Sequence, residues 1–111
     1  MIVTVVRFDL AEPIGPDEAQ SAFVDNASRY LQVPGLLWKA YLRSEDGTAV
    51  GGSYWWRDRA SAEAAFDTAW WDGVTAKYGT RPTLDWYEAP VVVDGRTGSI
   101  RLEAPAAGDS H

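Results

Sequence analysis

The chain has 111 residues and a formal net charge of -6 at pH 7, and its length is that of one ordinary domain. It contains no cysteine, and its single histidine is the last residue, His111. Disulfides, thiolate metal sites and a cysteine nucleophile are therefore excluded, and a histidine-based metal site or a serine–histidine dyad has almost no support. The acidic balance argues against nucleic acid or a membrane surface as partners. We expect no cofactor and no metal site.

Aromatic side chains are in excess, with six tryptophans and five tyrosines. The chemistry available is therefore that of aromatic surfaces, indole and phenol donors, carboxylates and a few basic groups. Met1 leads directly into an apolar, β-branched segment without the pattern of a signal peptide, and no apolar run is long enough to span a membrane. We expect a cytoplasmic protein.

The first half of the chain predicts a strand, a helix and a hairpin. Residues 2–10 predict a strand because they are mostly β-branched or aromatic and lack glycine and proline. Apolar residues at three- and four-residue spacing predict an amphipathic helix over 16–31. Residues 36–43 predict a second strand with Leu36 and Trp38 on the same face. Asp46-Gly47 predicts a turn into a third strand over 48–56.

The second half predicts a helix, a long strand and an arm. Asp58 is a good N-cap for a helix over 59–71, which a short turn over 72–78 extends. A last long strand is expected over 83–93. Residues 99–103 alternate in polarity and predict either an extra strand or an arm onto a partner. We therefore expect one domain over 1–94, followed by an arm and a flexible tail over 95–111.

The order of these elements is β-α-β-β-α-β, which predicts a ferredoxin-like α+β fold with an antiparallel sheet. Two helices cover only one face of a four-stranded sheet, yet the later strands are apolar on both faces. An identical sheet is the economical cover for the second face. We therefore expect a homodimer that forms an α/β barrel.

Three motifs resemble the YdhR-like monooxygenases of the dimeric α/β-barrel superfamily. They are PGLLWK over 34–39, the Ser-Glu turn over 44–45 and GGSY over 51–54. The family is similar in having a PGFLWK-like strand, a Ser-Glu turn and a GGIY-like strand, and the similarity is strongest over 34–66. The resemblance implies a homodimeric barrel and cofactor-free oxidation, with O2, of phenols or hydroquinones of polyketide type. The superfamily's haem-dependent members use a histidine near the iron, which this chain lacks apart from its last residue.

Seven side chains on the predicted strands and second helix are candidates for the site. The candidates for catalysis are Trp38, Lys39 and Tyr54. Trp38 and Tyr54 would donate hydrogen bonds to a developing oxyanion, and Lys39 would be a cation beside it. The candidates for binding the aromatic substrate are Trp56, Trp70, Tyr41 and Phe66. Neighbours on a strand point to opposite faces, so Trp38 and Lys39 diverge and Trp55 points away from Tyr54 and Trp56. Each of these aromatic residues could instead fill the core or an interface. Lys39 could instead be a lysine whose stem packs on apolar surface while its ammonium reaches solvent.

Two further questions stay open at the level of sequence. Gly51-Gly52 inside a strand predicts either a β-bulge or a close approach of backbone or ligand. No residue stands out as the general base. The alternatives to a monooxygenase are a non-catalytic binding module for a small aromatic or apolar ligand, a cofactor-free isomerase or cyclase, and a structural dimer whose tryptophans form the interface.

Overall fold

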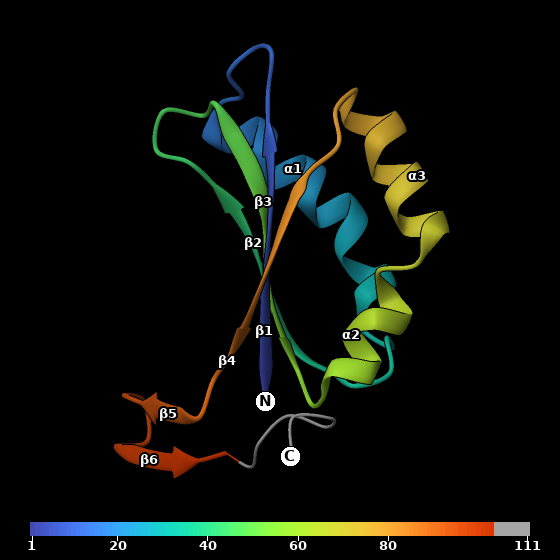
Figure 1. Ribbon diagram of the computed structural model, residues 1–111. Coiled ribbons are helices and arrows are strands. Elements are labelled where there is room, and N and C mark those ends of the chain that lie inside the picture. The colour runs from blue at the N-terminus through green and yellow to red at the C-terminus, as the bar shows by residue number, and fades with distance from the viewer. Residues whose placement is uncertain (104–111) are drawn as a thin grey trace.

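The computed structural model describes residues 1–103. Its elements are β1 (Ile2–Asp9), α1 (Pro16–Ala27), the 3-10 turn η1 (Ser28–Tyr30), β2 (Leu36–Arg43), β3 (Ala49–Trp56), α2 (Arg59–Ala65), α3 (Thr68–Tyr78), β4 (Thr83–Glu88), β5 (Val91–Asp94) and β6 (Ser99–Leu102). The first four strands form an antiparallel sheet in the order β2-β3-β1-β4. All three α-helices lie on one face of this sheet (Figure 1). The predicted ferredoxin-like α+β fold is confirmed.

The core lies between the sheet and the helices, and β1 shows why. Ile2, Thr4, Val6 and Phe8 alternate along β1 and are all buried, whereas the residues between them are more exposed. On the neighbouring strand Trp56 is fully buried, and its indole N–H donates a hydrogen bond of 3.0 Å to the hydroxyl of Thr4. The period-two pattern of these strands therefore fixes which face meets the helices.

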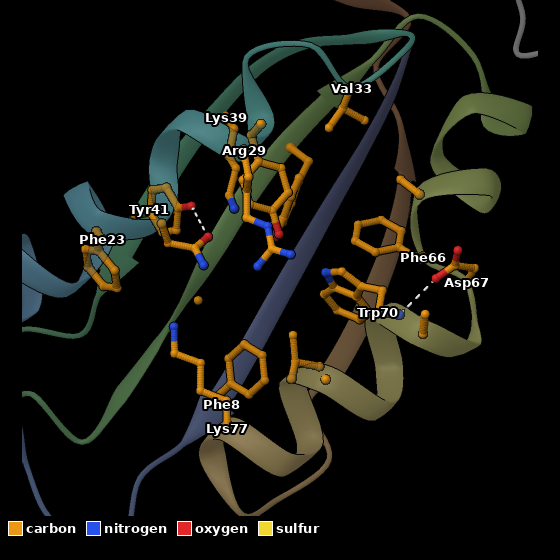
Figure 2. A pocket seen from close by; sticks show the side chains of 18 of the residues that line it. Phe8, Phe23, Arg29, Val33, Lys39, Tyr41, Phe66, Asp67, Trp70 and Lys77 are labelled. Carbon is orange, nitrogen blue, oxygen red and sulfur yellow. Dashed lines mark hydrogen bonds between the residues drawn. The ribbon is translucent and has the colours of Figure 1, made fainter.

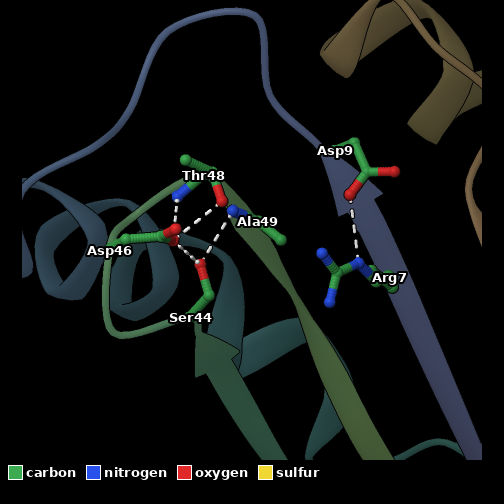
Figure 3. Close-up of polar contacts among 6 residues, drawn as sticks. All are labelled: Arg7, Asp9, Ser44, Asp46, Thr48 and Ala49. Carbon is green, nitrogen blue, oxygen red and sulfur yellow. Dashed lines mark hydrogen bonds and ion pairs between the residues drawn. The ribbon is translucent and has the colours of Figure 1, made fainter.

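The predicted hairpin turn joins β2 to β3 and is held by one carboxylate (Figure 3). Asp46 Oδ1 accepts hydrogen bonds from the backbone N–H of Thr48 at 3.0 Å and from the Ser44 hydroxyl at 2.9 Å. These contacts, led by the one from Thr48, lower the pKa of Asp46 to about 2. Gly47 has a φ of +75°, a conformation that glycine adopts without strain.

The predicted second helix is two helices. Asp58 caps α2 by accepting a hydrogen bond of 2.8 Å from the N–H of Ser61, as expected. The prediction of a continuous helix over 59–71 is wrong, because Asp67 accepts from the N–H of Trp70 at 2.8 Å and starts α3. In the part of the chain that the structure describes, no helix has the length and apolarity to cross a membrane.

Strand β2 carries an irregularity at its start. Its register against β3 shifts between Leu36 and Trp38. Leu36 packs against the core, whereas Trp38 is half exposed. The expectation that both share one face is therefore wrong, because the shift changes the alternation.

Gly51 and Gly52 keep a continuous register with both neighbouring strands, so they do not form a bulge. A Cβ atom added to Gly51 would overlap the carbonyl oxygen of Val6. Of the two explanations open from the sequence, the close approach of a neighbouring backbone is the one that the structure shows.

The end of the sheet differs from the predicted long strand. Strand β4 ends at Glu88, and β5 pairs with β6 instead of continuing the main sheet. Pro90 has no N–H to donate, which accounts for the interruption. The β5–β6 hairpin projects away from the helical layer (Figure 1), and the domain boundary expected at 94–95 falls inside it. Of the arm and flexible tail expected over 95–111, residues 104–111 lie outside the described residues.

Replacing Gly51 with alanine is expected to lower the free energy of unfolding by at least about 2 kcal/mol, because the methyl group forces β1 and β3 apart. The matched control is Gly73→Ala in α3, where no atom lies within 4 Å of the added methyl. Alanine there should stabilise the protein by about 0.5–1 kcal/mol. Urea unfolding measures both changes. An unaltered stability for Gly51→Ala would contradict the close approach.

Candidate active site

A cavity of about 480 Å³ lies between the sheet and the helices (Figure 2). This volume suits a small aromatic molecule. Its walls come from β1, β2, β3, α1, η1, α2, α3 and the short segment between α2 and α3. They are mainly aromatic, formed by Phe8, Phe23, Tyr30, Tyr41, Tyr54, Trp56, Phe66, Trp70 and Tyr78.

The side chain of Lys39 ends within a group of three tyrosine rings, which we call the tyrosine cage (Tyr30, Tyr41 and Tyr54). Its Nζ atom lies 3.3 Å from the ring centroid of Tyr30, 3.9 Å from that of Tyr41 and 4.5 Å from that of Tyr54. Strand β2 supplies Lys39 and Tyr41, β3 supplies Tyr54 and η1 supplies Tyr30. The faces of such rings stabilise a cation.

Gly52 makes room for this arrangement. A Cβ atom there would lie 3.3 Å from Cε of Lys39 and 3.1 Å from Cε1 of Tyr54. Each glycine of the Gly-Gly pair therefore has its own role. Gly51 admits a neighbouring backbone, and Gly52 leaves space for the lysine and the tyrosine.

The electrostatics of the cavity change the acid–base behaviour of Lys39. The pKa of Lys39 is lowered from 10.5 to about 7, chiefly by burial and in smaller part by the positive charges of Arg29 and Lys77. Near neutral pH a large fraction of Lys39 is therefore the free amine, which accepts a proton. Lys39 is thus a candidate for the general base that no residue supplied at the level of sequence.

Two tyrosines of the cage remain protonated. Burial, followed by the neighbouring Tyr30, raises the pKa of Tyr41 to about 12. Burial also raises the pKa of Tyr54 above its ordinary value. The Tyr41 hydroxyl donates a hydrogen bond of 2.8 Å to Oδ1 of Asn26, which fixes its ring at the cavity wall. Both phenols are therefore donors, and neither is a base.

The tryptophans of the cavity differ in whether their N–H groups are free. That of Trp56 is already bonded to Thr4, so Trp56 offers a ligand only its ring. The ring of Trp70 contacts that of Phe66 edge-on, with centroids 4.7 Å apart. Its Nε1 is buried and has no hydrogen-bond partner among the described residues. A buried donor of this kind costs free energy unless a ligand oxygen accepts from it.

Six of the seven predicted site residues are brought together around the cavity: Lys39, Tyr41, Tyr54, Trp56, Phe66 and Trp70. Trp38 is not among them, and its assignment to a common site with Lys39 is wrong. Alternation along β2 places Trp38 on the opposite face of the sheet, where it is 50% exposed and lies 5.1 Å from the Trp55 ring, centroid to centroid.

The sequence interpretation missed several residues that line the cavity. They are Asn26, Arg29, Tyr30 and Lys77. Asn26 and Tyr30 were detectable, because they are polar members of the otherwise apolar stripe of the first helix. Arg29 and Lys77 gave no signal, since one lies in a 3-10 turn and the other near the end of a helix.

The ferredoxin-like fold is one that solved oxygenase structures share. Residues 3–81 match the family described as "Putative mono-oxygenase ydhR", and the chain belongs to this family. No curated protein sequence gives a significant match.

Two solved structures share the fold. A variant of SnoaB, a cofactor-independent oxygenase from Streptomyces nogalater, is 21% identical with a TM-score of 0.58, over 79% of this chain and 91% of that one. A monooxygenase from the gene ActVA-Orf6 of Streptomyces coelicolor, in complex with the ligand Nanaomycin D, is 23% identical with a TM-score of 0.56, over 79% of this chain and 86% of that one.

Lys39 is expected to make stability depend on pH. Between its pKa of about 7 in the folded protein and 10.5 in the unfolded chain, only the unfolded chain binds the proton, so the free energy of unfolding rises with pH. Below about pH 7, Lys39 is protonated in both the folded protein and the unfolded chain. The cost of burying its ammonium group then lowers the free energy of unfolding in full. Lys39→Met should therefore stabilise the protein most near pH ~6 and progressively less as the pH rises.

Urea unfolding of both proteins from about pH 6 to about pH 9.5, below the range in which tyrosines titrate, measures this difference. Stability curves that run parallel for Lys39→Met and the wild type would contradict the low pKa of Lys39.

Proposed function

We propose that this protein is a cofactor-independent monooxygenase that oxidises an electron-rich phenol or hydroquinone of polyketide type with O2. The observation that carries the proposal is a lysine amine with a lowered pKa inside an aromatic cavity. Membership of the ydhR mono-oxygenase family supports it. So does the shared fold with SnoaB, which is described as a cofactor-independent oxygenase.

The first step is removal of the phenolic proton. The neutral amine of Lys39 accepts it, and the substrate becomes an electron-rich phenolate. The ammonium formed is stabilised by the rings of the tyrosine cage, of which that of Tyr30 is nearest at 3.3 Å. The same side chain is therefore a base before the transfer and a counter-cation to the phenolate after it.

The second step is oxygen transfer. The phenolate gives one electron to O2, and the superoxide and the aryloxyl radical combine at the ring carbon para to the hydroxyl. Lys39 returns its proton to the resulting peroxide, and the O–O bond then breaks. The outer oxygen leaves as water, with that proton and the remaining hydrogen of the para carbon, while the inner oxygen forms the new C=O bond. One oxygen atom stays in the quinone and the other in water. In this proposal, the N–H of Trp70 and the hydroxyl of Tyr54, two residues that line the cavity, donate to the developing oxyanions.

Turnover of a panel of anthrones, naphthols and hydroquinones tests this function. Quinone formation should require O2. With the anthrones and naphthols, whose para carbon carries hydrogen, one labelled oxygen atom should enter the product from ¹⁸O2. Lys39→Met should lower kcat/KM by about 10²–10⁴-fold, and wild-type kcat/KM should rise with pH through about 7 to a plateau, because the amine must be neutral. Arg57→Gln, at an exposed arginine outside the cavity, is the control.

Three results would contradict the proposal. Product formed without O2 or without gain of oxygen indicates an isomerase or cyclase. Tight binding of every aromatic compound without turnover indicates a binding module. A pH profile of kcat/KM that is unchanged in Lys39→Met shows that Lys39 is not the general base.

We also propose that a second copy of the chain covers the open face of the sheet. This face carries Trp38, Leu42 and Tyr87, which are 50%, 42% and 55% exposed. The β5–β6 hairpin adds four apolar side chains of one face, all more than half exposed: Val91, Val93, Ile100 and Leu102. An apolar surface of this extent is typical of an interface, and a self-complementary one is the commonest kind.

Sedimentation velocity at micromolar concentration should find the wild type as a dimer and Trp38→Lys as a monomer, because a lysine ammonium is buried at great cost in an apolar interface. Val24→Lys is the matched control, since Val24 is 66% exposed on α1, away from this face, and should stay dimeric. A monomeric wild type would contradict the homodimer.

A further inference from the structure

Three basic side chains from different elements meet in the cavity of this acidic protein. Arg29 comes from η1, Lys39 from β2 and Lys77 from α3. Figure 2 shows the guanidinium of Arg29 and the ammonium of Lys77 pointing into the cavity from opposite sides. Both residues are solvent-exposed, so they lie at its mouth, whereas Lys39 lies deeper in the tyrosine cage. A chain with a net charge of -6 thus presents a positive entrance.

Within residues 1–103, the two cations at the mouth have no acidic partner. The ion pairs found within residues 1–103 join other arginines to carboxylates near them in sequence, and none includes Arg29 or Lys77. Among the described residues that line the cavity, the single carboxylate is that of Asp67, and it accepts a hydrogen bond of 2.8 Å from the backbone N–H of Trp70. The described residues therefore place no carboxylate in an ion pair with Arg29 or Lys77, and Lys77 Nζ lies 5.5 Å from the ring centroid of Tyr78.

We propose that the substrate is an aromatic carboxylate, whose carboxylate lies between Arg29 and Lys77 while its ring enters the aromatic part of the cavity. This assignment rests on the proposed function and adds to it the substrate's second polar group. A phenolate needs one cation, and Lys39 serves it within the cage. Arg29 and Lys77 remain for another anion, and a planar guanidinium matches the two oxygens of a carboxylate.

The position at the mouth also fits a carboxylate. There the group keeps part of its hydration, so it avoids the full cost of burying a charge. The deeper wall, with Phe66 and Trp70, then receives the ring. The Trp70 N–H, which lacks a protein partner, is left for an oxygen on that ring.

Calorimetric binding of one hydroxynaphthoic acid and of its methyl ester, both under nitrogen, tests the assignment without any need for turnover. The acid should bind the wild type about tenfold more tightly than the ester or better. The double variant Arg29→Gln/Lys77→Gln should lose this preference and leave the affinity for the ester within about threefold. Arg57→Gln should keep the preference. Thermal melts verify that the variants, changed only at exposed positions, remain folded.

Equal affinities of the wild type for acid and ester, or a preference that survives in the double variant, would overturn the assignment. Binding and oxidation are read separately. An acid that binds through Arg29 and Lys77 but gives no quinone in air refutes the oxygenase and supports the anion site. An ester that is bound and oxidised as well as the acid refutes the anion site and supports the oxygenase.

Discussion

Lys39 experiences two opposing influences, and the chemistry of the cavity depends on their balance. The rings of Tyr30 and Tyr41, at 3.3 Å and 3.9 Å from Nζ, favour the ammonium. Burial and the charges of Arg29 and Lys77 favour the amine, and they prevail, because the pKa falls to about 7. A lysine held in this balance takes up a proton readily and is still stabilised as a cation once it has done so.

The fold produces this environment from simple alternation. Tyr54 and Trp56 face the helices while Trp55 faces away, and on β2 Lys39 and Tyr41 face inward while Trp38 faces outward. The aromatic excess of the sequence is thereby divided between a cavity and an exposed sheet face. We propose that the first receives a substrate and the second a partner chain, so each strand serves both purposes at once.

Much of the fold was predictable because it rests on local signals. The order of elements, the Asp58 cap and the Asp46-Gly47 turn all follow from residue type and spacing. The break at Asp67 was not predicted, since a capping side chain inside an apolar helical pattern competes with the pattern itself. Trp38 was misassigned because alternation separates two faces without saying which of them the helices cover. Arg29 and Lys77 were missed because only the tertiary fold brings η1 and α3 to one cavity.

The titration of Lys39 itself tests the central claim most directly. The chain contains only two lysines, so protein labelled with ¹³C at lysine Cε gives two side-chain signals, and the Lys39→Met variant identifies the one that belongs to Lys39. This signal is expected to titrate with a midpoint of about 7. A midpoint near 10.5, the ordinary value for lysine, would contradict the claim that Lys39 is the base of this site.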